Sequence, residues 1–315
     1  MRVYIKNILT ITAGVLIGMF LLLVVSVISL RWVNPSFTAF TLQENWDEVD
    51  TERYNLREYW VEYDRIPEHL RWAVIASEDQ RFWEHWGLDL EAIDEALEER
   101  RAGIRERGAS TITQQVAKNL YLWPAQSLFR KAVEAGIAVM IEIFWPKERI
   151  LEMYLNIAEF GPGIFGIGRA GEVIFGMEPS GLAADASARL AAVLPNPKRM
   201  RPEPPTPYAL ERSRWILRQM TQLTGINYLP PGEPDISEIE DMEEPEMPDF
   251  DWDLPDWDTL GRDSPGLDTL DTDVPDVDTL ETDTPDPDTL ETDVLDEVML
   301  ERDTLEADTL ETDPS

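Results

Sequence analysis

Three short segments of the chain carry side chains that could remove a proton and hold an anion. Glu78 and Asp79 form a carboxylate pair directly after an apolar stretch. The second segment follows Gly108 and bears hydroxyls, amides and a cation at Ser110, Thr111, Gln114, Gln115, Lys118 and Asn119. The third contains Arg130, Lys131 and Glu134. Carboxylates from separate segments with cations nearby suit a reaction in which one acid removes a proton while Lys and Arg stabilise an anionic leaving group.

Patterning alone also allows a structural interpretation of these groups. Adjacent acidic residues, and Arg–Glu pairs four positions apart on a helix, are usually solvated surface charges. Composition excludes other chemistries, because the chain has no Cys and only His69 and His85, and so has neither a thiolate nucleophile nor a His-rich metal site. The first 232 residues contain 29 acidic and 25 basic residues, which excludes a basic surface for nucleic acid.

The segments around these groups have the apolar spacing of helices, with few strand-like alternations. A helix is predicted to open at Ile66-Pro67-Glu68, with Pro in its first turn, and to run through Ala76. Further helices are predicted over 88–102, 110–121, 127–144, 147–157, 180–194 and 207–223. Residues 66–231 are therefore predicted to form a mainly α domain.

An uninterrupted apolar segment precedes this domain. Residues 8–30 contain no charged side chain, and these 23 residues are enough to cross a hydrocarbon core of ~30 Å. The segment is longer than the apolar run of a signal peptide, which predicts one uncleaved transmembrane helix. Arg2 and Lys6 lie before it and acidic residues soon follow Arg31, so residues 1–7 are predicted to be cytoplasmic. Residues 31–65 are then a periplasmic linker leading into the domain, beyond the inner membrane.

The segment from residue 232 to residue 315 has a different composition. From Glu233 onward it holds 33 acidic residues and 2 basic ones, which accounts for −31 of the net charge of −35. Asp-Thr-Leu recurs every ten residues from Asp258 to Asp288. Each repeat offers about one Leu among several like charges, which cannot offset the entropy of ordering the chain. This acidic tail is therefore predicted to be disordered and dispensable for the chemistry.

In their order, the motifs resemble those of the peptidoglycan glycosyltransferases of family 51. The family's Glu-Asp-x-x-Phe-x-x-His-x-Gly is matched at Glu78, Asp79, Phe82, His85 and Gly87. Its Gly-x-Ser-Thr-x-x-Gln-Gln is matched at Gly108, Ser110, Thr111, Gln114 and Gln115, and its Arg-Lys-x-x-Glu at Arg130, Lys131 and Glu134. Two further motifs match over 147–156 and 191–197. The chain has no Ser-x-x-Lys or Lys-Thr-Gly for a transpeptidase half, so it resembles the monofunctional members.

The resemblance implies a lysozyme-like glycosyltransferase domain that polymerises glycan chains. The growing lipid-linked chain is transferred with inversion to the 4-hydroxyl of lipid II, and undecaprenyl pyrophosphate leaves. Glu78 is the implied general base, and Glu134 the implied second catalytic carboxylate, which orients the cations or holds a metal. The structural alternative for Glu134 is a pair with Arg130 four residues earlier.

The resemblance also implies which residues meet the substrate. The expected contacts are Asp79, Ser110, Thr111, Gln114, Gln115, Lys118, Asn119, Arg130 and Lys131. Lys118, Arg130 or Lys131 would stabilise the pyrophosphate, with or without a divalent cation, magnesium or manganese. No organic cofactor is implied.

Neighbouring residues have both structural and functional interpretations. His85 is expected to be a structural hydrogen-bonding residue beside the glycine turn, and Gln115 either contacts substrate or caps a neighbouring backbone. Trp123 and Phe129 belong to an aromatic and aliphatic cluster. The cluster either packs in the core or forms a lobe that dips into the membrane interface, where a lipid-linked substrate must be met.

Two positions depart from the family pattern. Many members have an Arg four residues before the Arg-Lys pair, where this chain has Gln126, so one pyrophosphate contact is missing. Where Glu-Ala-Ala is common after the glycine-rich turn, this chain has Gly168-Arg169-Ala170. Arg169 is a candidate for the compensating cation.

Two other function classes remain open at this point. Two carboxylates on an α domain would also suit a membrane-bound lysozyme-like hydrolase that cleaves the same glycan. A non-enzymatic scaffold could use the acidic tail to recruit cell-division or wall-synthesis proteins. Cations beside the carboxylates favour the synthase, because a neutral glycan has no pyrophosphate to neutralise.

Overall fold

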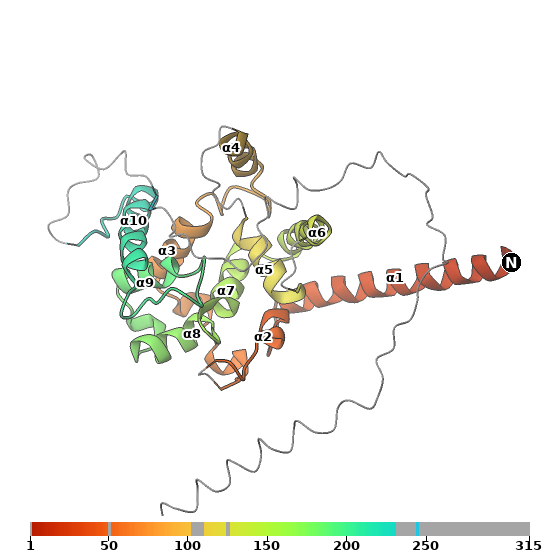
Figure 1. Cartoon of the computed structure of the whole chain (residues 1–315), viewed down its shortest axis with the longest axis horizontal. Coiled ribbons are helices and arrows are strands. Elements are labelled where there is room, and N and C mark those ends of the chain that lie inside the picture. The colour runs from red at the N-terminus through yellow and green to blue at the C-terminus, as the bar shows by residue number, and fades with distance from the viewer. Residues whose placement is uncertain (1, 50–51, 102–109, 124–126, 231–243, 246–315) are drawn as a thin grey trace, which may run out of the picture. The chain divides into compact units, whose positions relative to one another are not determined.

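Helices make up almost all of the regular structure in residues 2–49, 52–101, 110–123, 127–230 and 244–245, the part described by the computed structural model (Figure 1). The long helices are α1 (Arg2–Leu30), α3 (Glu68–Glu78), α4 (Leu90–Arg101), α5 (Ile112–Tyr121), α6 (Leu128–Phe144), α7 (Lys147–Ile157), α9 (Ala184–Ala192) and α10 (Pro207–Thr224). Shorter elements are α2 (Ala39–Gln43), α8 (Ile167–Ala170), the 3-10 turns Leu56–Tyr59, Tyr63–Arg65 and Pro179–Gly181, and the π turn Gly171–Phe175. An antiparallel hairpin joins β1 (Glu159–Gly161) to β2 (Ile164–Phe165). The prediction of a mainly α domain is confirmed.

Helix α1 is apolar on all sides. Its stretch Lys6–Leu30 has a mean hydropathy of 2.8. Leu9 and Phe20 are more than half exposed, unlike the side chains of a core helix. Because apolar side chains that face no protein require apolar surroundings, the length and composition of α1 fit a single-pass membrane anchor.

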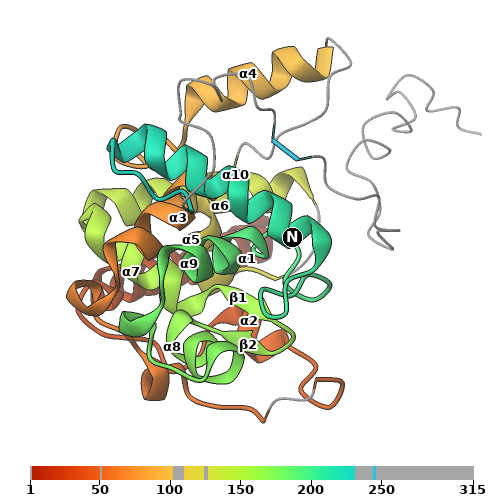
Figure 2. The ribbon, with the colours of Figure 1, turned by 90° about the vertical axis from the view of Figure 1, so that its left-hand side faces the viewer.

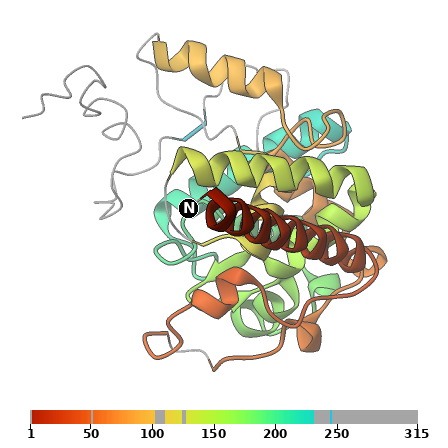
Figure 3. The ribbon, with the colours of Figure 1, turned by 90° about the vertical axis from the view of Figure 1, so that its right-hand side faces the viewer.

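The last turns of α1 are bound to the rest of the protein. Val27 is fully buried, and its carbonyl oxygen accepts a hydrogen bond of 2.7 Å from Trp145 Nε1. The carbonyl oxygen of Leu30 accepts one of 2.9 Å from Arg149 Nη2. Helix α6 also contacts α1 and crosses it (Figure 3). The anchor is therefore fixed to α6 and α7, and not attached through a free loop.

Residues 31–65, expected to be a linker and the entry to the domain, contribute side chains to its core. Leu56 and Val61 are buried. The side chain of Asn156 on α7 pairs with the backbone of Val61, accepting from its N–H at 2.8 Å and donating to its carbonyl at 2.9 Å. These bonds satisfy buried polar groups on both segments, so they fix the segment to the domain.

The core is built around α7, in which every residue from Arg149 to Ile157 is buried. Helices α5 and α6 pack on one side of the domain, and α3, α9 and α10 form a second packed group (Figure 2). Ala188, Ala191 and Ala192 give α9 a surface of small side chains, which lets α3 and α10 approach closely. Helix α4 lies on the outside (Figure 2).

One carboxyl group in the hairpin is expected to make stability depend on pH. Burial raises the pKa of Glu159 to about 7, with Lys198 opposing the shift and Glu44 adding to it. Since the folded state favours the protonated form, stability should fall as pH rises from 4.5 to 7. Glu159→Gln removes this dependence and should raise stability at pH 8 by about 1–2 kcal/mol, below the full linkage value because the side chain is only partly buried.

Denaturant unfolding of the full chain at pH 5 and pH 8 measures this difference. Glu178→Gln, at an exposed ion pair with Arg65, is the control that should give the same change at both pH values. If Glu159→Gln raised the free energy of unfolding equally at the two pH values, the raised pKa of Glu159 would be contradicted.

The predicted disorder of residues 232–315 falls outside the described residues, except at Glu244 and Pro245. Glu244 forms an ion pair with Arg212 on α10. At this residue the acidic tail meets the domain, which the sequence did not lead us to expect.

Candidate active site

Glu78 lies at the end of α3, where two neighbours hold its carboxylate. Gln115 Nε2 on α5 donates to Oε2 at 2.8 Å, and Ser77 Oγ donates to Oε1 at 3.2 Å. Tyr154 on α7 donates in turn to Gln115 Oε1 at 3.1 Å. Burial holds the pKa of Tyr154 well above its ordinary value, so this hydroxyl keeps its proton. Glu78 itself is half-buried, which leaves a fixed carboxylate that a ligand can reach.

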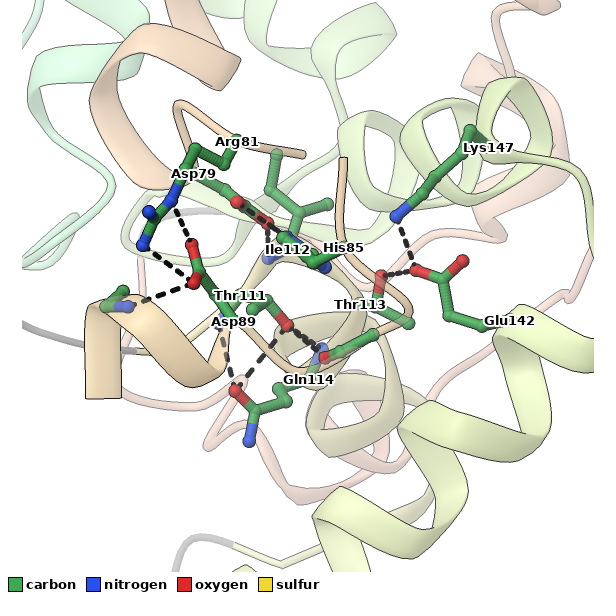
Figure 4. Close-up of polar contacts among 12 residues, drawn as sticks. Asp79, Arg81, His85, Asp89, Thr111, Ile112, Thr113, Gln114, Glu142 and Lys147 are labelled. Carbon is green, nitrogen blue, oxygen red and sulfur yellow. Dashed lines mark hydrogen bonds and ion pairs between the residues drawn. The ribbon is translucent and has the colours of Figure 1, made fainter. Parts of the chain in front are cut away.

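Asp79 is buried and forms structural hydrogen bonds, while the substrate contact expected at this residue stays a prediction. His85 Nε2 lies 2.8 Å from Oδ1, and the backbone N–H of Ile112 donates to Oδ2 at 2.9 Å (Figure 4). The carboxylate thereby satisfies a free N–H at the start of α5 and complements its helix dipole. The prediction that His85 is a structural hydrogen-bonding residue is confirmed.

A buried network joins the glycine turn to α5, α6 and α7. Gly87 has a φ of +78°, and a Cβ there would lie 2.8 Å from Glu142 Cγ, so only glycine fits. Glu142 accepts hydrogen bonds of 2.7 Å from both Lys147 Nζ and Thr113 Oγ1 (Figure 4). This contact fixes the helices that carry the candidate site.

Thr111 and Gln114 form a capping box at the start of α5. Thr111 Oγ1 accepts from the N–H of Gln114 at 3.1 Å, and Gln114 Oε1 accepts from the N–H of Thr111 at 3.0 Å. Both side chains are buried, so the expected substrate contacts at these two residues are replaced by a structural role. The capping alternative considered for Gln115 thus belongs to Gln114. Asn119 is likewise buried on α5.

A cluster of charges on α6 faces the same region. Glu134 is 2 % exposed, and its Oε2 lies 3.0 Å from Arg130 Nη1 while its Oε1 lies 2.6 Å from Lys131 Nζ. Lys131 Nζ also donates to Ser110 Oγ at 2.8 Å. Glu134 therefore holds two cations at once. It forms the structural pair with Arg130, and it also positions Lys131.

Lys118 on α5 lies within the electrostatic reach of both glutamates. Burial lowers the pKa of its ammonium group; Glu134 opposes the shift, Lys131 and Arg130 add to it, and Glu78 opposes it. In the described part of the chain no carboxylate lies within ion-pair distance of Lys118 Nζ. The centroid of the Phe40 ring lies 5.5 Å from this nitrogen. This cation is therefore the one best placed to accept an anionic ligand.

Comparison with known proteins decides the family. Residues 45–221 match the family model described as "Transglycosylase". The chain belongs to the transglycosylase family. The resemblance to the peptidoglycan glycosyltransferases of family 51 is confirmed, and with it the prediction of an enzyme.

Several relatives of this transglycosylase carry the name "Biosynthetic peptidoglycan transglycosylase". The protein from Ectopseudomonas mendocina is 48% identical over 204 residues, which are 64% of this chain and 84% of that protein. The protein from Pseudomonas putida is 47% identical over 209 residues, 65% of this chain and 88% of that protein. The protein from Xanthomonas oryzae is 46% identical over 210 residues, 66% of this chain and 85% of that protein.

Arg169 of this transglycosylase does not join the charge cluster on α6. Its Nη1 donates to Tyr59 Oη at 3.1 Å, and its guanidinium lies 4.9 Å from the Tyr59 ring and 3.7 Å from Glu172. With Tyr54 and Tyr59 it lines a cavity of about 400 Å³ formed largely by residues 52–59. The hypothesis that Arg169 compensates for Gln126 therefore receives no support, and Gln126 itself lies outside the described residues.

One acidic cluster beside Glu78 was missed by sequence reasoning. Ligand atoms of Asp79, His85 and Asp89 lie within 4.8 Å of one another. Arg81, however, donates to both oxygens of Asp89, at 2.8 and 2.9 Å (Figure 4). Burial raises the pKa of Asp89, but the N–H of Ala92 and Arg81 outweigh it, so the pKa lies below its ordinary value. The Arg81 guanidinium therefore supplies the positive charge beside Asp89, and its hydrogen bonds stabilise the loop before α4.

Proposed function

We propose that this transglycosylase polymerises peptidoglycan by transferring the growing lipid-linked chain to the 4-hydroxyl of lipid II. Undecaprenyl pyrophosphate is the leaving group, and the configuration at the anomeric carbon is inverted. The observation that carries the proposal is the pairing of a reachable, fixed carboxylate at Glu78 with a partly buried cation at Lys118 and two further cations held by Glu134.

In this reaction Glu78 removes the proton of the acceptor hydroxyl. A general base must lie within hydrogen-bond reach of the hydroxyl whose proton it removes, so its placement is decisive. Gln115 and Ser77 supply that placement, one at each carboxylate oxygen. The attacking oxygen then forms the new bond to the anomeric carbon as the bond to pyrophosphate breaks.

Lys118, Arg130 and Lys131 stabilise the negative charge that develops on the leaving pyrophosphate. A divalent cation at this place does not fit the residues present. Both oxygens of Glu134 are already bound to cations, and three positive side chains surround the position. We therefore assign the stabilisation of the pyrophosphate charge to these three side chains, without a metal ion.

Two substrates test the proposed reaction. The full chain, reconstituted in detergent or vesicles, should convert labelled lipid II into long glycan and leave finished glycan intact. Release of fragments from finished glycan, without growth on lipid II, would establish the lysozyme-like hydrolase instead.

The lipid-linked substrate requires the site to lie at a membrane, and we place the protein in the inner membrane with α1 as a single-pass anchor. The N-terminus is assigned to the cytoplasm and the catalytic domain to the periplasm, because Arg2 and Lys6 precede the apolar segment. Large apolar side chains are exposed at Trp123, just after α5, and at Leu128, Phe129 and Ile143 on α6, the helix that also carries Arg130 and Lys131. We assign this apolar patch to the membrane interface, in agreement with the packing of α6 beside α1.

A double substitution in the patch tests its role. Leu128→Ser with Phe129→Ser should raise KM for lipid II in vesicles about 5- to 10-fold, or about 1–1.4 kcal/mol, because the interface buries the two side chains only in part. Activity on a short-chain substrate in detergent should be unchanged. Ile226→Ser, at an exposed apolar residue after α10, is the control. Equal KM values in vesicles for the double variant and the parent would refute the membrane contact.

A further inference from the structure

Arg212 on α10 is a buried cation directly behind the proposed base. Its side chain is 6 % exposed. Its Nη2 donates to Ser77 O and to Ser77 Oγ, both at 3.4 Å, and Ser77 Oγ donates to Glu78 Oε1 at 3.2 Å. Two hydrogen bonds therefore connect this guanidinium to the carboxylate that is assigned the proton transfer.

The other terminal nitrogen of Arg212 is occupied by the acidic tail. Nη1 forms an ion pair with Glu244, which lies 32 residues further along the chain and outside the segment 45–221 that matches the family. Tyr208 Oη accepts a longer bond of 3.5 Å from the same nitrogen. Among the described residues, Glu244 is the carboxylate within ion-pair distance of this guanidinium.

The pairing has a clear electrostatic cause. Burial lowers the pKa of Arg212, but Glu244 outweighs it, so the pKa lies above its ordinary value. A guanidinium removed from water requires a counter-charge, and a neighbouring carboxylate in a partly buried place is weakly screened by salt. Without Glu244, Nη1 would keep the longer hydrogen bond to Tyr208 and could bind another anionic group.

We propose that Glu244 is an intramolecular ligand of Arg212 that competes with an anionic group of the substrate, so that the start of the acidic tail restrains the enzyme. The effect on catalysis rests on the proposed polymerase function, whereas the docking of Glu244 does not. The binding group is the Arg212 guanidinium, which can pair with a carboxylate or with a phosphate oxygen. Removing Glu244 exposes the guanidinium to the incoming substrate.

A spin label tests the docking by itself. The chain has no Cys, so Pro245→Cys carries a single nitroxide next to Glu244 in the full protein. We expect slow motion of the label in this parent and fast motion after Glu244→Gln. Glu211→Gln, which removes an exposed carboxylate beside Arg212 in the sequence, should leave the label slow. Equal mobility in the parent and the Glu244→Gln variant would overturn the docking.

Kinetics on labelled lipid II tests the competition. Glu244→Gln should lower KM about 3- to 10-fold with kcat changed less than about twofold, the scale of one partly buried charge pair. A chain ending at Gly232 should behave in the same way, and Glu211→Gln should match the native chain. An unchanged or higher KM in the Glu244→Gln variant would overturn the competition, whatever the label shows. If no form polymerises lipid II, the proposed function fails while the label still reports the docking.

Discussion

Replacement of Glu78 by Gln is expected to lower glycan polymerisation by at least ~100-fold, the scale of losing a general base. The amide has the same shape, and its single oxygen keeps one of the two hydrogen bonds that Gln115 and Ser77 donate to the carboxylate. The site is half-buried, so the donor that loses its partner can turn to water. The fold should therefore persist, while the group that takes the proton of the acceptor hydroxyl is gone. The loss should appear in kcat, because the proton transfer occurs in the transition state.

The measurement is the initial rate of polymer formation from labelled lipid II, together with the melting temperature of each variant. Glu84→Gln is the matched control, since Glu84 lies in the same motif but is exposed. It should retain the native rate. More than a tenth of the native turnover in a folded Glu78→Gln protein would refute the assignment of the base.

Replacement of Lys118 by Met should reduce turnover by roughly 30-fold or more, which follows from the loss of about 2–5 kcal/mol when a partly desolvated anion is left unpaired. The ammonium group interacts electrostatically with both Glu78 and Glu134, whereas Arg130 and Lys131 are already held by Glu134. Met has a similar length and keeps the apolar contacts of the side chain. The change therefore removes mainly the positive charge.

Two further variants separate charge from structure at this position. Lys118→Arg should recover part of the rate, because the charge returns in a different shape. Lys198→Met removes an exposed cation that pairs with Glu44, and its rate should equal that of the native chain. A silent Lys118→Met would mean that Lys118 does not face the pyrophosphate, and only the assignment of Glu78 would survive.

The sequence by itself determined the helices, the apolar anchor and the family. Apolar spacing placed α5, α6, α7 and α10 within a few residues of their observed bounds, because the period of a helix is a local property of the chain. Five motifs in order predicted that Glu78 and Glu134 belong to one site. The i,i+4 relation of Arg130 and Glu134 was also local, and the structure contains that pair.

Only the tertiary structure decided which of these polar residues hold the fold and which lie together around Glu78. Gln115 reaches Glu78 across 37 residues, and Asn156 reaches Val61 across 95 residues. Such bonds depend on how whole helices pack, whereas residue spacing determines only which side chains share one face of one helix. Consecutive amides on α5 thus have different partners. Gln114 caps the start of the helix, and Gln115 donates to Glu78. The same limit hid the pairing of Glu244 with Arg212, since a tail that cannot build a core can still supply one carboxylate to a buried cation.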